Sequence, residues 1–288
     1  MQVIQNQDLK EELRIFIERG LQEDVGSGDH TSQACVPVSQ ISKAHLLVKQ
    51  QCVLSGVEVA RQMIVYVDPD ATIETLMEDG QYANPGDIVF KVTMNSRALL
   101  MIERLLLNTI QRMCGISTMS RKYAEAIQEF GVQVLDTRKT TPQLRFLEKA
   151  AVAIGGCTNY RFGLYDRIMI KDNHVEAAGS LKNALHLVKD YLQENDLDLE
   201  ITVEVRNFKE LDEAIEVGGF ERIMLDNFSV HEMAEAVTYI QGRYEVEASG
   251  GITYEYLVPV AKTGVDFISV GALTHGVKAV DLSLKIIG

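Results

Sequence analysis

The stretch "ITVEVRNFKELDEAIEVGGFERIMLD" (residues 201–226) contains two short apolar runs joined by a helix-like segment. A carboxylate lies at or near the end of each run, Glu204 in the first and Asp226 in the second. Apolar runs that alternate with helical segments are typical of βα units, in which parallel strands alternate with helices. The stretch therefore predicts an α/β fold with a parallel sheet.

The same unit repeats through the second half of the chain. Similar apolar runs occur at residues 132–136, 167–171, 244–251 and 266–272. The steps from Glu204 to Asp226, then to Ser249 and then to Gly271 are 22, 23 and 22 residues. Such regular spacing, without the GxGxxG start of a dinucleotide-binding sheet, favours a (β/α) barrel. A doubly wound sheet stays the alternative.

The first third of the chain mixes strand-like and helix-like segments, which predicts a small α+β domain with one covered face. A long helical segment follows at residues 97–113. We expect Gly115 to break it, so that a second helix at residues 118–131 forms a pair with the first and bridges the two domains.

Charge and composition exclude several classes of protein. The 288 residues carry a formal net charge of −13, which argues against a nucleic-acid partner and an anionic membrane surface. The first residues lack the apolar segment of a signal peptide, and no run approaches the ~18 apolar residues of a membrane span. The four cysteines have no CxxC spacing, which favours reduced thiols. A cytoplasmic enzyme or binding protein is the expectation.

One region departs from the acidic average. Residues 136–174 hold seven Lys or Arg against four Asp or Glu. Arginine forks match carboxylates and phosphates, and lysine acts as a point charge, so the region predicts a site for a small polyanion. For Lys149 and Arg167 a solvated surface charge is the simpler interpretation. Lys171 directly follows the apolar "IMI" and is the better site candidate.

The ends of the predicted strands would form the active site, since barrels place catalytic groups at the carboxyl ends of their strands. Glu204 and Asp226 could hold Mg²⁺ with substrate phosphates, or face positive charge developing on a sugar ring. A structural salt bridge to Arg138 or Lys171 is the alternative. His174 is expected to play a supporting role in the loop after Lys171.

The last two predicted strands end in glycine-containing segments, "ASGGI" and "SVGAL". Ser249, Gly250 and Gly271 could bind a phosphate through loop N–H groups, because glycine lets the backbone approach an anion closely. The alternative is that these glycines only form tight turns.

Several motifs together resemble the quinolinate phosphoribosyltransferases over nearly the whole chain. They are "EDVGSGDHTS", "ERLLLN", "DTRKTTPQLR", "NYRFGLYD", "IKDNHV", "MLDNF", "EASGGI" and "ISVGALTH". The resemblance implies an N-terminal α+β open-sandwich domain of residues 1–114, joined by the tail 275–288. It also implies that residues 115–274 form an incomplete (β/α) barrel, with fewer than eight strands, that carries catalysis.

The resemblance further implies the reaction. Phosphoribosyl pyrophosphate and quinolinate would give nicotinate mononucleotide, pyrophosphate and CO2, with Mg²⁺ as cofactor, in NAD biosynthesis. The protein would be a cytoplasmic homodimer or dimer-based oligomer in which Arg104 reaches the partner's site.

Site roles follow from the same resemblance. Substrates would be bound by Arg104, Arg138, Lys139, Tyr160, Arg161, Lys171, Glu204, Asp226, Ser249, Gly250 and Gly271. The catalytic residues would be Lys139, Lys171, Glu204 and Asp226. The metal would be held by Glu204 and Asp226.

Three positions depart from the family pattern. Gln143 replaces a glycine, Tyr160 replaces a histidine and so cannot carry its positive charge, and Arg206 reverses an acidic charge. Arg206 could pair with Glu204 or contact an anion. Three rival hypotheses stay open: a lyase with Lys171 as Schiff base, a relative of the molybdenum-associated proteins with an altered substrate, and a non-catalytic binding protein.

Overall fold

The computed structural model describes residues 7–287. The chain forms two compact units. The first comprises residues 1–121, 141–156 and 276–288, and the second comprises residues 122–140 and 157–275.

A six-stranded parallel sheet organises the second unit. Its strands are β6 (Gln133–Leu135), β7 (Ile168–Ile170), β8 (Ile201–Val205), β9 (Arg222–Asp226), β10 (Glu245–Ser249) and β11 (Phe267–Ser269). The spatial order is β6-β11-β10-β9-β8-β7. Strands β7 to β11 therefore lie side by side in sequence order, and β6 pairs with β11. The sheet would close into a barrel only if β6 also paired with β7. The predicted incomplete barrel is confirmed, and the doubly wound alternative is wrong because that sheet reverses its strand order.

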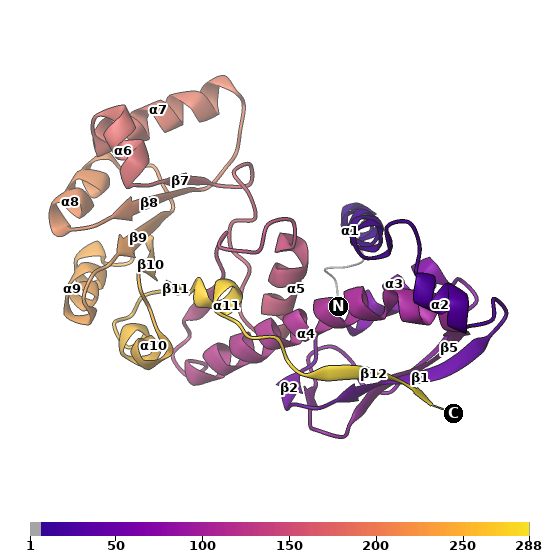
Figure 1. Cartoon of the computed structure of the whole chain (residues 1–288). Coiled ribbons are helices and arrows are strands. Elements are labelled where there is room, and N and C mark those ends of the chain that lie inside the picture. The colour runs from indigo at the N-terminus through magenta and orange to yellow at the C-terminus, as the bar shows by residue number, and fades with distance from the viewer. Residues whose placement is uncertain (1–6, 288) are drawn as a thin grey trace. The chain divides into compact units, whose positions relative to one another are not determined.

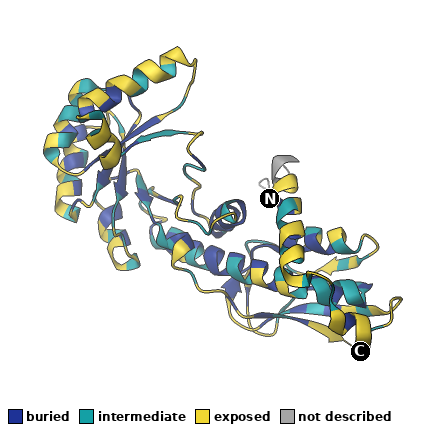
Figure 2. Ribbon diagram, turned by 45° about the horizontal axis from the view of Figure 1, so that its top comes forward, coloured by how far each residue is buried: buried dark blue, intermediate teal, exposed yellow. Residues whose placement is uncertain are grey.

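Helices flank this sheet along one face (Figure 1). They are α6 (Asp172–Ala178), α7 (Leu181–Glu194), α8 (Phe208–Val217), α9 (Val230–Ile240), α10 (Tyr254–Ala261) and α11 (Ala272–His275). Ser180, Asn207 and Ser229 begin α7, α8 and α9 by accepting a main-chain N–H of the first turn. The helices bury the side toward the sheet and expose the opposite side (Figure 2).

The strands of the second unit alternate between two kinds of side chain. Val203, Ile223 and Ala248 are buried apolar residues of neighbouring strands. The residues next to them in sequence are polar or charged in many places, as Thr202 and Glu204 illustrate. Because successive side chains of a strand point to opposite faces, one face of the sheet is apolar and the other is rich in polar groups.

Residues 157–167 connect the two edge strands, β6 and β7. Thr158 lies alongside β6: its N–H donates to Val134 O at 2.8 Å, and its carbonyl accepts from Asp136 N at 3.1 Å. This irregular segment thus supplies hydrogen bonds to part of the free main-chain edge of β6.

The first unit is built on a four-stranded antiparallel sheet in the order β12-β1-β5-β3. Its strands are β1 (Ile41–Val48), β3 (Thr72–Thr75), β5 (Ile88–Asn95) and β12 (Leu282–Ile287), and β2 (Cys52–Val53) pairs with β4 (Tyr82–Ala83). The helices are α1 (Gln7–Val25), α2 (His30–Cys35), α3 (Val57–Val67), α4 (Ser96–Ala126) and α5 (Arg145–Gly155). Since β12 pairs with β1, the predicted return of the C-terminal tail is confirmed.

The predicted break at Gly115 is wrong, because α4 is one continuous helix of 31 residues. A Cβ at Gly115 would lie 2.3 Å from the carbonyl oxygen of Lys278. The glycine therefore lets the C-terminal segment pass against the helix. Close packing, and not helix termination, explains it.

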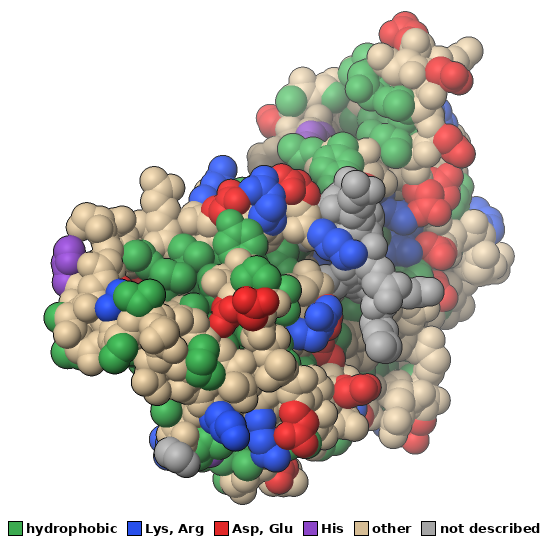
Figure 3. Space-filling view, turned by 90° about the vertical axis from the view of Figure 1, so that its right-hand side faces the viewer, with side chains coloured by type: hydrophobic (Ala, Val, Ile, Leu, Met, Phe, Trp, Pro, Cys, Tyr) green, Lys and Arg blue, Asp and Glu red, His purple; other side chains and the backbone are tan. Residues whose placement is uncertain are grey.

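The exposed surface mixes both signs of charge, as the face drawn in Figure 3 shows. Arg14 pairs with Glu11 and Glu18 on α1, and Arg61 pairs with Glu58 on α3. Such exposed pairs contribute little to stability. The four cysteines are free thiols, and within the described residues no helix has the length and apolar character to cross a membrane.

Gly115→Ala should destabilise the protein. The added methyl group overlaps the Lys278 carbonyl, so we expect the free energy of unfolding to fall by about 1–3 kcal/mol in urea titrations. Asn108→Ala, at an exposed position of the same helix, is the control and should change it by less than about 0.5 kcal/mol. Equal effects of the two substitutions would contradict the packing explanation.

Candidate active site

All the predicted site residues except Arg104 lie in the second unit. The carboxyl ends of β6–β11 carry Arg138, Lys139, Lys171, Glu204, Asp226, Ser249, Gly250 and Gly271, and the segment beside the end of β6 carries Tyr160 and Arg161. Arg104 belongs to the first unit, where it is exposed on α4. Because carboxyl ends of parallel strands share one edge of the sheet, the predicted groups gather there.

Gly271 and Lys139 meet at the end of β11. A Cβ at Gly271 would lie 3.0 Å from Lys139 Cδ and 3.2 Å from the ring of His275. Thr274 Oγ1 donates to the Lys139 carbonyl at 2.8 Å and fixes the main chain at this lysine. The glycine thus leaves room for the lysine stem, which joins a cation to the glycine-rich end of the site.

Arg138 and Arg161 form a second cationic group. Burial, and next the nearby Arg138 charge, lower the pKa of Arg161. Arg161 Nε donates to Gly163 O at 2.6 Å, which orients its guanidinium. Two cations near enough to repel each other favour an anionic ligand between or beside them.

Lys171 and Glu204 form an ion pair across β7 and β8. The Glu204 side chain is 7% exposed and the Lys171 side chain 42% exposed, so the ammonium group keeps contact with the solvent side of the site. His174 Nδ1 accepts from Lys171 N at 3.0 Å, which confirms its expected supporting role. Glu204 therefore forms a salt bridge to Lys171, as the alternative interpretation of this carboxylate predicted.

Asp226 and Gly250 are linked by Asn227, a residue that the sequence analysis did not single out. Asn227 Nδ2 donates to Asp226 Oδ2 at 2.7 Å, and its main-chain N donates to Ser249 O at 3.0 Å. Gly250 has φ +93°, and a Cβ there would lie 2.4 Å from Asn227 Oδ1. Glycine is needed for both the conformation and the space. The sequence signal was an asparagine directly after a strand-end carboxylate.

Local contacts explain two of the three positions at which the chain differs from the family pattern, Arg206 and Gln143. Arg206, just before α8, donates to Glu210 in the first turn of that helix at 2.7 Å, so its predicted pairing with Glu204 is wrong. Gln143 has φ +66°, a left-handed conformation that glycine adopts more easily. Its Oε1 accepts from Arg19 Nη1 at 3.1 Å within the first unit.

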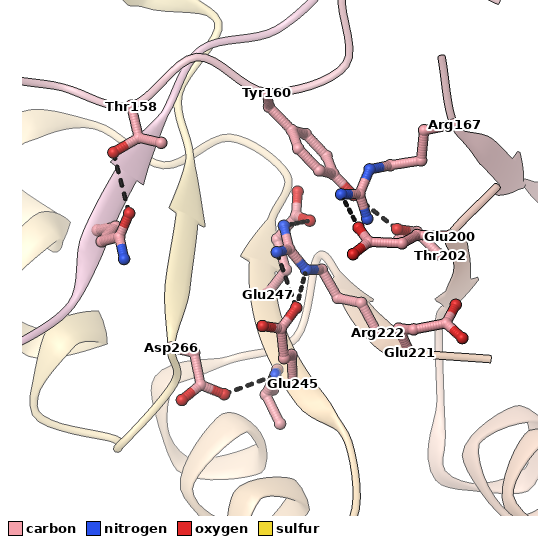
Figure 4. A network of polar contacts seen from close by, with 12 residues as sticks. Thr158, Tyr160, Arg167, Glu200, Thr202, Glu221, Arg222, Glu245, Glu247 and Asp266 are labelled. Atoms are coloured by element: carbon pink, nitrogen blue, oxygen red, sulfur yellow. Dashed lines mark hydrogen bonds and ion pairs between the residues drawn. The ribbon is translucent and has the colours of Figure 1, made fainter. Parts of the chain in front are cut away.

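Below the strand ends lies a set of polar side chains that we call the polar layer: Tyr160, Thr202, Arg222 and Glu247, which Figure 4 shows, and Ser269, which bonds to Glu247. Tyr160 turns its hydroxyl to Thr202 Oγ1 at 2.6 Å. Burial, with the nearby Glu247 charge, raises the pKa of Tyr160 to about 12. The alternation of polar residues in "ITVEV", "RIMLD" and "EVEAS" was the sequence signal for this layer.

A divalent metal would find few protein ligands here. Among residues 7–287 no group of three or more His, Cys, Asp or Glu could hold a metal ion. Glu204 pairs in register with Met224, two residues before Asp226, so both carboxylates point to the same face. Magnesium usually keeps several waters and binds one or two carboxylates together with substrate phosphates. The two carboxylates fit that mode of binding.

Comparison with known proteins matches both parts of the chain to family models. Residues 29–114 match the quinolinate phosphoribosyl transferase N-terminal domain, and residues 116–285 match the C-terminal domain of the same family.

Curated relatives and solved structures agree with these models. The chloroplastic nicotinate-nucleotide pyrophosphorylase (carboxylating) of Arabidopsis thaliana is 41% identical over 290 residues, 96% of this chain and 83% of the relative. Quinolinate phosphoribosyltransferase (decarboxylating) 1b of Nicotiana tabacum is 41% identical, with 96% and 82% covered. The nicotinate-nucleotide pyrophosphorylase structure from Francisella tularensis is 34% identical, has a TM-score of 0.90, and matches 100% of this chain and 99% of that one.

Gly250→Ala should be more destabilising than a glycine replacement with similar backbone strain. Gly86 has φ +100° and no atom within 4 Å of an added Cβ, so Gly86→Ala measures strain alone. We expect Gly250→Ala to lower the free energy of unfolding by about 1–3 kcal/mol more than Gly86→Ala, because its methyl group displaces Asn227. Matching denaturation midpoints would show that Asn227 moves aside freely.

Proposed function

The chain belongs to the quinolinate phosphoribosyltransferase family, and we propose that it transfers the phosphoribosyl group of phosphoribosyl pyrophosphate to quinolinate with loss of CO2. The products would be nicotinate mononucleotide, pyrophosphate and CO2, in NAD biosynthesis.

One observation carries the proposal. Cations from β6 and the segment after it lie at the same edge of the sheet as the glycine-rich ends of β10 and β11. Quinolinate has two carboxylates and phosphoribosyl pyrophosphate is a polyanion, so both substrates need concentrated positive charge. Phosphates are favoured where glycine leaves main-chain N–H groups accessible.

The cations would divide between the two substrates. Arg138 and Arg161 would bind the carboxylates of quinolinate, since guanidinium forks match carboxylates in a bidentate manner. Lys139, held beside Gly271, would bind phosphate or pyrophosphate oxygens, and Ser249 with Gly250 would bind the 5-phosphate.

The carboxylates would act on the ribose. Glu204 and Asp226 would bind ribose hydroxyls, hold Mg²⁺ with the pyrophosphate, and stabilise positive charge on the sugar ring as the bond to pyrophosphate breaks. Bound Mg²⁺ would neutralise charge on the departing pyrophosphate. Lys171 would orient Glu204 and present its ammonium group to the substrate anions.

The reaction balances without an added oxidant or reductant. The lone pair of the quinolinate ring nitrogen forms a bond to the anomeric carbon, and the electrons of the broken C–O bond leave with pyrophosphate. The resulting pyridinium accepts the electron pair released when the 2-carboxylate departs as CO2. A proton from solvent then fills the ring position.

Two further features follow the family resemblance. We expect a homodimer or dimer-based oligomer in which exposed Arg104 enters the partner's site. A cytoplasmic location stays a prediction, and the relatives include chloroplastic and mitochondrial forms.

The Schiff-base hypothesis finds less support. A Schiff-base lysine must present a free amine to a carbonyl substrate, whereas the Lys171 side chain is bonded to the Glu204 carboxylate. Borohydride should therefore trap no adduct with a carbonyl substrate.

The direct test offers the purified protein Mg²⁺, phosphoribosyl pyrophosphate and either quinolinate or nicotinate. We expect nicotinate mononucleotide and CO2 from quinolinate alone, and loss of turnover with EDTA that excess Mg²⁺ restores. Quinolinate binding without product would indicate a non-catalytic protein. Absence of binding would favour an altered substrate.

Arg138→Gln should raise KM for quinolinate about 10–100-fold, the range for a lost hydrogen bond to a charged group. KM for phosphoribosyl pyrophosphate should change less. Arg206→Gln is the matched control, since Arg206 is exposed and bonded to Glu210, and it should leave both constants near wild type. A larger effect on phosphoribosyl pyrophosphate would reassign Arg138.

A further inference from the structure

The polar layer lies one step beneath the candidate site on the same face of the sheet. Thr202 is two residues before Glu204, and Glu247 is two residues before Ser249. Ser269 is likewise two residues before Gly271. Residues i and i+2 of a strand point to one face, so Thr202, Glu247 and Ser269 each lie beneath a site position, and Arg222 lies on the same face four residues before Asp226.

Two opposite charges dominate the layer. Arg222 has a side chain 6% exposed, and that of Glu247 is 0% exposed. Arg222 Nη1 donates to Glu247 Oε2 at 3.4 Å, and its Nε and Nη2 donate to Glu245 Oε2 at 3.0 and 2.8 Å. Ser269 donates its hydroxyl to the other Glu247 oxygen. Buried charges of this kind require each other, because neither is solvated.

Arg222 is also fixed by aromatic rings. Its guanidinium carbon lies 3.7 Å from the ring centre of Phe267 and 4.8 Å from that of Tyr160. Arg167 lies on the Tyr160 ring as well, at 5.0 Å (Figure 4). Cations over aromatic faces are attracted by the ring quadrupole, so the two arginines hold the tyrosine ring.

Tyr160 links the polar layer to the two arginines that would bind quinolinate. Its hydroxyl bonds to Thr202 and lies near Glu247, and burial raises its pKa to about 12, so it is protonated at neutral pH. Its main-chain N donates to Asp136 Oδ1 at 2.9 Å, two residues before Arg138. Arg161 is the next residue in the chain. Tyr160 therefore connects the polar layer, which its side chain contacts, to the segments that carry the two arginines, which its main chain joins.

We propose that Arg222 and Glu247 are positioning residues that act as a charge-balanced pair through Tyr160 to hold Arg138 and Arg161 for the carboxylates of quinolinate. This inference rests on the proposed function. It predicts a selective effect: quinolinate affinity should fall, whereas phosphoribosyl pyrophosphate would meet groups at the ends of β8 to β11 and Lys139, whose main chain is held separately by Thr274.

Because Arg222 and Glu247 compensate each other's charge, single and double substitutions should have different effects. R222Q leaves the Glu247 carboxylate buried without its cation, whereas R222Q/E247Q removes both charges and keeps similar shapes. Breaking one member of a buried pair is much more disruptive than replacing both. The exposed pair Arg14 and Glu11 provides matched controls, R14Q and R14Q/E11Q.

Isothermal titration calorimetry with each substrate alone supplies the readout, so that no turnover occurs. We expect R222Q to weaken quinolinate binding about tenfold or more at pH 7, and R222Q/E247Q to recover to within about fivefold of wild type. Phosphoribosyl pyrophosphate affinity should change less than about threefold in both variants, as should both affinities in the controls.

A pH series separates positioning from general loss of structure. Glu247 faces Arg222 on β9, Ser269 on β11 and Tyr160, and Glu245 lies two residues before it on its own strand. Burial already raises the pKa of Glu247, and loss of Arg222 raises it further. Below that pKa the carboxyl is neutral, so the quinolinate affinity of R222Q should approach that of wild type as pH falls. As pH rises, the affinity of R222Q should fall below that of wild type. R222Q/E247Q should lack this dependence.

Three outcomes would overturn the proposal: wild-type quinolinate affinity in R222Q, equal losses for both substrates, or no recovery in R222Q/E247Q. Should R222Q fail to fold, Thr202→Val replaces it: it removes the hydrogen-bond partner of the Tyr160 hydroxyl, and it must weaken quinolinate binding while sparing phosphoribosyl pyrophosphate. Wild-type protein that binds no quinolinate would instead refute the proposed function, and with it the inference.

Discussion

The ion pair between Arg222 and Glu247 is the interaction on which the second unit depends most. Parallel strands covered by helices need apolar side chains on one face, and the other face of this sheet encloses charges that have almost no access to water. A buried carboxylate is tolerated when a cation and further hydrogen bonds compensate it. Arg222 and Ser269 do so for Glu247, and the polar interior of an unclosed barrel becomes an ordered support for the strand ends above it.

The contrast between this layer and the site explains how an acidic chain holds anions. In the layer, positive and negative charges balance. At the strand ends, burial and repulsion by the Arg138 charge lower the pKa of Arg161, and Lys171 pairs with Glu204. A ligand with several negative charges relieves this repulsion. Local charge in a cleft can thus oppose the formal net charge of −13.

Sequence patterns predicted the features that follow from periodicity and strand-end chemistry. The regular steps between Glu204, Asp226 and their successors gave the barrel order, and glycines at strand ends marked positions where an added Cβ has no room. Gly115 was misjudged because a helical glycine can serve either a break or a close approach, and only the tertiary contact with Lys278 distinguishes them. Arg206 was misjudged because the first turn of α8 offers Glu210 as a partner, a contact that the strand pattern around Glu204 does not indicate. The polar layer was overlooked because burial of charge depends on partners from distant strands.

The central claim is that the layer orients the arginines while the arginines bind the substrate. A crystal structure with quinolinate bound tests it most directly. The account predicts carboxylate oxygens within about 3 Å of Arg138 and Arg161, with the Tyr160 hydroxyl still bonded to Thr202. Quinolinate seated away from these arginines, or a Tyr160 hydroxyl that has left Thr202 to bind quinolinate itself, would contradict it.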